Sequence, residues 1–381
     1  MIVRKAFRFR LKPKTKDHQQ LVNFAGSCRY IYNWGLEQRK KTFESEGKGL
    51  SYYDQNVHLT KLKKELEWLK EPHSQILQQS LYDLDKAFQH FFRRIKQKET
   101  PGYPRYKAKG IRDAFRYPQG VKIEENKAYL PKIGWIKFRK TREIEGTLKQ
   151  TTISRRGDHW YISFSCEIHQ PDPIQAPLNP EKAVGIDLGL IYFGVLASGL
   201  DNQRQIINPP KYLKTQLPKL RKLSRALSRK KKGSQNWKKA KNKLARLHAK
   251  IRYSRENFAH QLSTKIVKSH DIICVENLQI TLMLKEKKFS RSIADASWRS
   301  FLSYLKYKAL NQGKHLVELG KYFPSSQQCS SCGHRQKIAL SQREFECESC
   351  KLVLDRDYNS SIVIKAAGTS ALLKACGVTS G

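Results

Sequence analysis

Two closely spaced pairs of cysteines near the C-terminus constrain the fold of this chain more than any other feature of its sequence. Cys329 and Cys332 form the first pair, Cys347 and Cys350 form the second, and 14 residues lie between the pairs. Two CxxC pairs at this separation predict four thiolates around one Zn²⁺ in a structural site, because protein ligands fill all four tetrahedral positions. Two redox-active dithiols are the alternative, but no thioredoxin-like βαβ pattern surrounds the pairs.

Two acidic residues end strongly apolar segments that are typical of buried strands. Asp187 ends the segment 183–187, and Glu276 ends the segment 272–276. A carboxylate at the end of a buried strand is costly unless it is paired or bound to a metal ion. If the two strands are parallel neighbours, both carboxylates lie at the same end of the sheet and can share Mg²⁺.

A third acidic candidate, Asp357, lies in the segment 355–361, which directly precedes the apolar residues 362–364. An aspartate before a helix is commonly an N-cap, which is the alternative role. The order of the candidates favours a metal site, because RNase H-type nucleases place an aspartate on the first strand, a glutamate on a later parallel strand and an aspartate on the final helix. The cysteine pairs then fall between a last strand near 315–319 and that helix.

The charge balance of the chain requires a polyanionic partner. Its 381 residues include 74 Lys and Arg against 33 Asp and Glu, which gives a formal net charge of +41. Such a field favours nucleic acid, and 6 Trp, 17 Tyr and 16 Phe supply both cores and base-stacking surfaces. No stretch approaches the roughly 18 apolar residues of a membrane span, and the N-terminus has no leader-like apolar run. We therefore expect a cytoplasmic, nucleoid-associated protein with no membrane partner.

Positive charge is most concentrated in the segment 211–255, which has 12 Lys, 6 Arg and no acidic residue. Leucines at helical spacing predict two amphipathic helices joined near 232–233, within a basic helical region 211–269. A solvated helix face is the alternative, but so large an imbalance repels itself unless phosphates neutralise it. The candidate nucleic-acid contacts are Lys230, Lys231, Lys232, Lys238, Lys239 and Arg252 here, and Arg4, Arg8 and Arg10 near the N-terminus.

The N-terminal half changes its hydrophobic period twice. Residues 3–11 alternate apolar and basic side chains, which predicts a strand with one basic face. Helical periodicity then predicts helices over 17–46, 57–68 and 77–95. Beyond 101–104 the alternation returns and predicts antiparallel hairpins that form a small barrel. The first strand has no partner in the helical block, so we expect it to join this barrel, with the helices as an insertion.

These features together resemble the TnpB family, which comprises transposon-encoded, RNA-guided nucleases related to type V CRISPR effectors. The resemblance extends over nearly the whole chain and rests on four motifs: GIDLG at 185–189, VENL at 275–278, CSSCG at 329–333 and DRDYN at 355–359. In the family the last motif usually continues with two alanines, whereas this chain has Ser360 and Ser361. Both side chains are small, so we expect metal binding to be unaffected.

The resemblance implies a multidomain α/β architecture. It consists of an oligonucleotide-binding-like β barrel (WED) with an inserted helical REC lobe, followed by a RuvC-like nuclease of the RNase H type with an inserted zinc ribbon. The implied segments are 1–12 (WED strand), 13–100 (REC lobe), 101–180 (WED barrel), 181–324 (first part of the nuclease), 325–352 (zinc ribbon) and 353–381 (last part of the nuclease).

The resemblance also implies an activity and its partners. Asp187, Glu276 and Asp357 would hold two Mg²⁺ ions about 4 Å apart and hydrolyse both strands of a DNA target. A transposon-end guide RNA, bound by one protein monomer, would select double-stranded DNA beside a short adjacent motif. The residues implied for reading that motif are Tyr52, Tyr53, Gln78, Arg116 and Tyr117, for which packing within the helical lobe is the alternative.

Two other functions are compatible with parts of this pattern. A nuclease-independent, RNA-guided DNA-binding repressor would share the fold and the charge, but relatives of that kind lose site carboxylates and this chain retains all three. An unguided RNase H-like resolvase or transposase would share the carboxylates, but it would not need a large basic half made of a barrel and helices. RNA that co-purifies with the protein would separate the second alternative from a guided enzyme.

Overall fold

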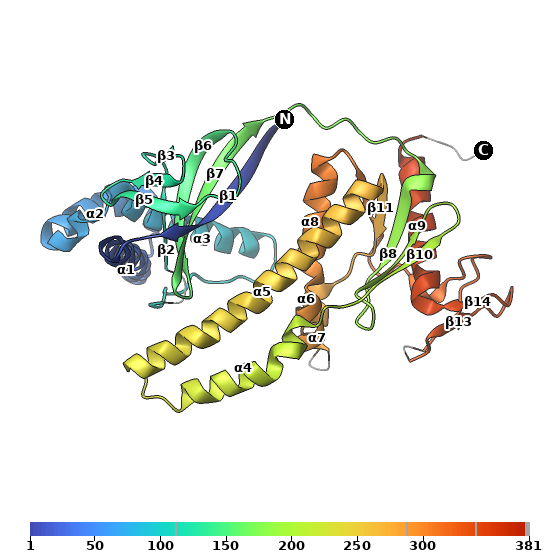
Figure 1. The fold of residues 1–381 in the computed structure, drawn as a ribbon. Helices are drawn as coiled ribbons and strands as arrows, with labels where there is room; N and C mark the ends of the chain where they lie inside the picture. The colour runs from blue at the N-terminus through green and yellow to red at the C-terminus, as the bar shows by residue number, and fades with distance from the viewer. Residues whose placement is uncertain (111–112, 287–288, 340, 378–381) are drawn as a thin grey trace. The chain divides into compact units, whose positions relative to one another are not determined.

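The computed structural model describes residues 1–110, 113–286, 289–339 and 341–377. The last segment expected from the sequence, 353–381, ends in residues 378–381, which lie outside the described residues. The chain divides into two compact units, Met1–Pro171 and Asp172–Gly381. Each unit has its own large sheet (Figure 1). Each also has its own hydrophobic core.

Unit 1 is built on a seven-stranded antiparallel sheet. β1 pairs with β7 along Ile2 to Arg10 and with β5 from Arg10 to Lys12, so the predicted pairing of the first strand across the helical segment is confirmed. The sheet is curled, and the described residues show no ladder between β2 and β3, so the predicted barrel is an open sheet. In spatial order the strands are β2 (Ala114–Tyr117), β6 (Thr147–Arg156), β7 (His159–His169), β1 (Ile2–Lys12), β5 (Gly134–Arg139), β4 (Lys127–Leu130) and β3 (Lys122–Glu124).

The predicted helical block lies between β1 and β2 in the chain and shares one core with the apolar face of the sheet. The middle helix begins earlier than its apolar pattern predicts. Ser51 caps it, because the Ser51 Oγ accepts the backbone N–H of Asp54 and the Asp54 carboxylate accepts the backbone N–H of Ser51. The elements are α1 (Thr15–Glu46), α2 (Tyr52–Glu65), η1 (Glu67–Lys70) and α3 (Ser74–Lys96).

Unit 2 contains a five-stranded mixed sheet. β8 and β11 are parallel neighbours, β12 runs parallel to β11, and β9 is antiparallel to both β8 and β10. All four residues of β11 and the first four of β8 are buried, as the continuous apolar runs predict for strands covered on both faces. In spatial order the strands are β10 (Gln203–Ile207), β9 (Gly194–Ser198), β8 (Ala183–Asp187), β11 (Ile272–Val275) and β12 (His315–Glu318).

Helices cover both faces of this sheet. α5 and α8 pack on one face through Leu262, Ile266, Phe301 and Leu305, and α9 packs on the other, where Ile364 joins the core. α4 and α5 form the long antiparallel hairpin that the basic segment predicts (Figure 1). The remaining elements of the unit are η2 (Pro180–Lys182), α4 (Tyr212–Ser228), α5 (Gln235–Ser269), α6 (Ile280–Met283), α7 (Ser290–Ala296), α8 (Trp298–Asn311), η3 (Ser325–Gln327), β13 (Glu344–Glu346), β14 (Val353–Asp355) and α9 (Arg356–Ala375). Among the described residues, no helix is both long and apolar enough to cross a bilayer.

Candidate metal centres and nucleic-acid surfaces

The pairing of β8 with β11 brings two of the predicted carboxylates to one end of the sheet. Ile186 is in register with Val275, so Asp187 and Glu276 occupy the next position along the two parallel strands. Asp357 reaches the same place from the first turn of α9. A Cβ atom built on Gly189, two residues after Asp187, would lie 3.9 Å from Asp357 Oδ2. The structure therefore gathers all three predicted residues at this edge.

Close packing of α9 against the sheet makes this arrangement possible. A Cβ atom at Gly185 of β8 would lie 2.1 Å from the Ser361 carbonyl oxygen, and one at Gly368 of α9 would lie 2.5 Å from Cys274 Sγ. Any side chain at either position would push the helix away from the strands. The two glycines thus fix the height of α9 above β8 and β11, and with it the position of Asp357.

The helix cap that competed with the metal role for Asp357 belongs to another residue. Asp355 is the N-cap of α9, and its carboxylate accepts the backbone N–H of Tyr358 at 3.0 Å. Asp357 is the second residue of the helix, within its first turn, and contacts Arg356 at 3.1 Å and Arg343 at 4.0 Å. Two guanidinium groups therefore lie beside its carboxylate. The role of Asp357 as a metal ligand stays a prediction, and capping does not account for the residue.

The electrostatics of the cluster oppose three simultaneous negative charges. Burial, and then the charges of Glu276 and Asp357, raise the pKa of Asp187 well above its ordinary value. Burial likewise raises the pKa of Glu276, although a hydrogen bond from Ser325 partly offsets this effect. A divalent cation would relieve this repulsion, and carboxylate oxygens are the ligands that Mg²⁺ prefers. The three residues therefore fit a magnesium site.

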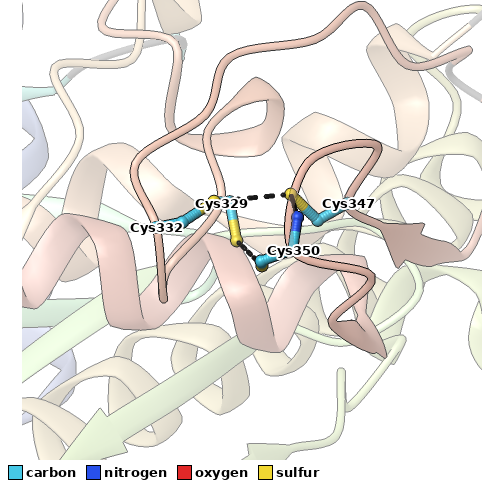
Figure 2. Close-up of side chains that lie close together, drawn as sticks. All are labelled: Cys329, Cys332, Cys347 and Cys350. Atoms are coloured by element: carbon cyan, nitrogen blue, oxygen red, sulfur yellow. Dashed lines mark hydrogen bonds between the residues drawn. The ribbon is translucent and has the colours of Figure 1, made fainter.

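The four predicted cysteines form the second candidate centre (Figure 2). Their Sγ atoms all lie within 4.8 Å of one another, with Cys329 and Cys350 3.6 Å apart and Cys332 and Cys347 3.5 Å apart. Tetrahedral Zn–S bonds of about 2.3 Å place sulfur atoms roughly 3.8 Å apart, so the spacing fits zinc. The backbone N–H of His334 hydrogen-bonds to Cys332 and lowers the pKa of that thiol to about 6, which favours the thiolate that zinc requires.

The two centres differ in how tightly their ligand atoms converge. In the part of the chain that the structure describes, the four cysteines form a group whose ligand atoms all lie within 4.8 Å of one another. The oxygen atoms of the three carboxylates do not all come within that distance of one another. Thiols attract one another weakly and tolerate close contact, whereas ionised carboxylates repel unless a cation lies between them. The sequence predicted both sets of candidate ligands but did not indicate Ser325, whose hydroxyl donates to the Glu276 carboxylate.

The basic hairpin of α4 and α5 exposes most of the predicted nucleic-acid contacts. Lys230, Lys231 and Lys232 lie exposed in its turn, and Lys238 and Lys239 are exposed on the first turn of α5. Arg252 is partly buried and pairs with Glu256 at 3.6 Å.

The hairpin is anchored at its base by a residue that the sequence did not indicate. The Asp295 carboxylate of α7 accepts the backbone N–H of Leu213 and of Lys214 at the start of α4. It also pairs with Arg255 of α5 at 2.8 Å. One partly buried carboxylate therefore ties together the two helices that carry the densest positive charge, and fixes the direction in which the hairpin extends.

A second basic surface lies on the solvent face of the unit 1 sheet. Lys137 of β5 is directly opposite Lys12 of β1 and Lys127 of β4, and all three are exposed. The predicted contact Arg10 is exposed and faces Arg139 in the same way. Like charges in direct opposition destabilise a sheet, so this surface favours an anionic partner. Sequence reasoning missed Lys12, Lys127, Lys137 and Arg139, because cross-strand register decides which charges meet.

The other two predicted arginines of β1 make contacts within the sheet. Arg4 pairs with Glu167 at 3.0 Å, and the guanidinium of Arg8 lies 5.7 Å from the centre of the Tyr161 ring. Arg4 also lines a cavity of about 560 Å³, which Lys86, Arg116 and Lys149 border. A cavity with four basic side chains and one acidic side chain, Glu167, suits a negatively charged or polar guest.

The residues implied for reading an adjacent motif occupy different environments. Tyr53 is 79% exposed, and Tyr52 packs edge-on against both Tyr53 and Tyr82. Arg116 lines the same cavity and pairs with Asp83. Tyr117 is fully buried, and its hydroxyl donates to the Pro131 carbonyl oxygen at 3.0 Å. Packing accounts for Tyr117, and Gln78 is partly buried on α3.

Comparison with known protein families gives three matches along the chain. Residues 163–287 match the IS605 OrfB family, described as "Probable transposase". Residues 298–364, which include the cysteine pairs, match the "Cas12f1-like, TNB domain". Residues 1–48 match a "Helix-turn-helix domain", although the structure there has the strand β1 and the single long helix α1.

Two curated relatives cover nearly the whole chain, and a third covers half of it. "Putative RNA-guided DNA endonuclease InsQ" of Escherichia coli K12 is 34% identical over 98% of this chain and 94% of its own length. A "Putative RNA-guided DNA endonuclease" of Streptomyces pristinaespiralis is 36% identical over 98% of this chain and 91% of its own. A "TnpB-like protein" of Acanthamoeba polyphaga mimivirus is 27% identical over 50% of this chain and 38% of its own.

Among solved structures, the mini-RNA-guided endonuclease Cas phi3 aligns over 96% of this chain and 92% of its own, with 10% identity and a TM-score of 0.48. The family assignment rests on the sequence relatives, of which two exceed 30% identity over almost the full length of both chains. The chain belongs to the IS605 OrfB family of transposon proteins, the family of TnpB.

Proposed function

We propose that this protein is an RNA-guided DNA endonuclease that cleaves both strands of its target by metal-dependent hydrolysis. The observation that carries the proposal is the convergence of Asp187, Glu276 and Asp357 at the shared end of β8, β11 and the first turn of α9. The names of the full-length relatives, which describe RNA-guided DNA endonucleases, support the same activity. On this proposal, unit 1 comprises the WED and REC regions, and unit 2 the RuvC-like nuclease with its zinc ribbon.

The chain's own residues prepare the carboxylate cluster for cations. Glu276 follows the buried strand β11, and its carboxylate accepts a hydrogen bond from Ser325. Arg356 and Arg343 border Asp357 and restrict the orientations open to its carboxylate. When bound, a pair of Mg²⁺ ions would supply activation of water and stabilisation of the leaving 3′ oxygen, and the products would carry a 5′-phosphate. The four cysteines would hold one Zn²⁺ with a structural role.

The two basic surfaces support guide RNA and DNA as partners. The α4–α5 hairpin and the lysine row that Lys12, Lys127 and Lys137 form on the unit 1 sheet both concentrate exposed positive charge. A protein that delegates sequence recognition to a guide needs large phosphate-binding surfaces and few base-reading side chains. We infer that one protein chain binds one transposon-end guide RNA. We also infer that the motif beside the target is read at the cavity that Arg116 lines.

Substitution of the carboxylates tests the proposal directly. Protein loaded with its co-purifying RNA should cleave matching DNA in Mg²⁺. Asp187→Ala, Glu276→Ala or Asp357→Ala should each reduce the rate on the order of 10³-fold or more, because no neighbouring group replaces a lost ligand. RNA binding, measured by filter retention, should be unchanged.

The same experiment separates the alternatives. Undiminished cutting by any variant would remove that residue from the site. Specific, RNA-dependent DNA binding without cleavage by the unaltered protein would establish a repressor. Cleavage that does not require RNA would establish an unguided nuclease.

A further inference from the structure

Two buried polar side chains, one on the zinc ribbon and one on α9, connect the ribbon to the elements that carry the carboxylate cluster. The ribbon, residues 325–352, begins at η3, whose first residue is Ser325. Ser325 is only 3% exposed, and its hydroxyl donates to Glu276 Oε1. Glu276 lies one residue beyond the end of β11, where the ladder no longer fixes the chain. The hydroxyl of the ribbon therefore sets the orientation of this carboxylate.

A second contact ties the first cysteine pair to the helix that carries Asp357. Asn359 is fully buried on α9, two residues after Asp357. Its side-chain Nδ2 donates to the Gln328 carbonyl oxygen at 2.7 Å, and its Oδ1 accepts the backbone N–H of Ser330 at 2.9 Å. These two bonds bracket Cys329 on both sides. One side chain thus clamps the backbone at a zinc ligand onto the first turns of α9.

The ribbon has little other means of keeping its shape. Among its described residues, the buried apolar ones are Cys329, Phe345 and Cys347, with Ile338 and Leu352 beside them. Its strand β13 has three residues and pairs with β14, which follows the ribbon and is equally short. A segment with so small a core obtains most of its folding free energy from its metal ion. The position of Ser325 therefore depends on the four thiolates being joined.

We propose that the zinc ribbon is a positioning element of the nuclease site, in which Ser325 orients Glu276 and Asn359 fixes the first cysteine pair to the helix of Asp357. The inference rests on the proposed function, because it assigns the carboxylates to a metal-dependent reaction. Zinc then acts on cleavage through these two side chains. Both side chains are buried and act through other residues, so both are positioning residues.

Ser325→Ala is the direct test, with Ser326→Ala as the matched control because Ser326 is exposed on the next position of the same turn. Ser325→Ala should lower the cleavage rate about 10- to 100-fold, the range for loss of a partner that orients a metal ligand, and should raise the Mg²⁺ concentration that gives half-maximal rate. Ser325→Thr keeps the hydroxyl and should restore most of the activity. Zinc content and RNA binding should remain those of the unaltered protein in all three variants.

A binding measurement separates this inference from the proposed function. Titration with Mn²⁺, followed by electron paramagnetic resonance, reports occupancy of the carboxylate site whether or not DNA is cut. Ser325→Ala should weaken Mn²⁺ binding relative to Ser326→Ala. Equal Mn²⁺ affinity in the two variants would overturn the inference, even in an active enzyme. Absence of cleavage by the unaltered protein, with Mn²⁺ binding weakened only in Ser325→Ala, would instead reject the endonuclease function and leave the positioning role intact.

Asn359→Ala tests the second contact by a different readout. The variant should release zinc to a chromogenic chelator about 10-fold or more faster than the unaltered protein, because the backbone on both sides of Cys329 loses its partner. Asn359→Asp keeps the acceptor for Ser330 N–H and loses the donor to Gln328, so its release rate should be intermediate. Release as slow as in the unaltered protein from both variants would show that α9 does not stabilise the ribbon.

Discussion

The two large sheets of the molecule present charged groups in opposite ways. In unit 1, β1 alternates, so that Phe9 and Leu11 are buried while Arg10 and Lys12 face solvent. In unit 2, the central strands are covered on both faces and charged groups appear only where a strand ends, at Asp187 and Glu276. An alternating sheet offers a broad surface that suits an extended polyanion. A doubly covered sheet offers a single edge, which suits a compact metal site.

The largest expected effect comes from adding one methyl group to the doubly covered sheet. In Gly185→Ala the new Cβ would lie 2.1 Å from the Ser361 carbonyl oxygen and 2.6 Å from the Lys365 backbone nitrogen. Backbone atoms cannot rotate aside, so α9 must move, at a cost of about 1–3 kcal/mol or more. Thermal unfolding should show this loss, and cleavage should fall with it because Asp357 moves with the helix.

Gly26→Ala in α1 of unit 1 is the matched control. Its nearest neighbour, Arg29 Nη2, is 3.7 Å from the added Cβ, which is an ordinary contact. Alanine in a helix interior is favoured over glycine by roughly 0.5–1 kcal/mol, so this variant should be slightly more stable. Equal unfolding temperatures for Gly185→Ala and the unaltered protein would mean that α9 is not held at a fixed height.

These close approaches mark the limit of what the sequence could predict. The carboxylates and the cysteine pairs were found because strand periodicity and ligand spacing are local properties of the chain. The roles of Ser325, Asn359 and Asp295 depend on contacts across 49, 29 to 31 and 81 to 82 positions, respectively, and no local pattern marks them. Prediction of the lysine row would have required the register of β1, β5 and β4. The start of α2 was missed because Ser51 caps the helix before its apolar residues begin to recur.

The crowding of carboxylates in unit 2 predicts a stability that depends on pH and on metal. Because the pKa of Asp187 is raised in the folded protein, the stabilisation linked to its bound proton is complete below its ordinary pKa of about 3.9. That stabilisation is lost as the pH rises through the raised value. Without divalent metal, Asp187→Asn should therefore unfold at a higher temperature than the unaltered protein at pH 7, by about 2–4 °C for each 1 kcal/mol gained.

Addition of Mg²⁺ should reverse this order. The cation stabilises the folded state that binds it, and Asn at position 187 offers a weaker ligand than the aspartate. Calorimetric scans at pH 7 with and without Mg²⁺ measure both differences. A metal-free variant that unfolds at or below the temperature of the unaltered protein would show that the carboxylates do not repel one another in the folded site.

The exposed turn of the α4–α5 hairpin should contribute to binding and not to stability. Replacing Lys230, Lys231 and Lys232 with glutamine should reduce the slope of log affinity against log salt by about 2–3 on duplex, if each lysine neutralises one phosphate. A triple replacement of Lys61, Lys64 and Lys70 removes the same charge from the helical lobe of unit 1 and should change the slope less. Equal slopes for both variants would indicate that the three lysines of the hairpin turn are solvated and do not contact phosphates.

The smallest expected effect lies on the alternating sheet, and it has opposite signs in the free and bound protein. Lys137→Gln removes the charge that faces both Lys12 and Lys127, so the RNA-free protein should gain about 0.2–1 kcal/mol at low salt. The same variant should bind RNA more weakly, because a phosphate contact is lost. Lys122→Gln is the control: Lys122 pairs with Tyr129 in the same sheet, so its removal relieves no direct opposition of like charges in that pair. Denaturant unfolding of both variants, with and without RNA, measures the two signs. If Lys137→Gln were no more stable than Lys122→Gln, the opposed lysines would not destabilise the free protein. The lysine row would then give no reason to assign this face of the sheet to a polyanion.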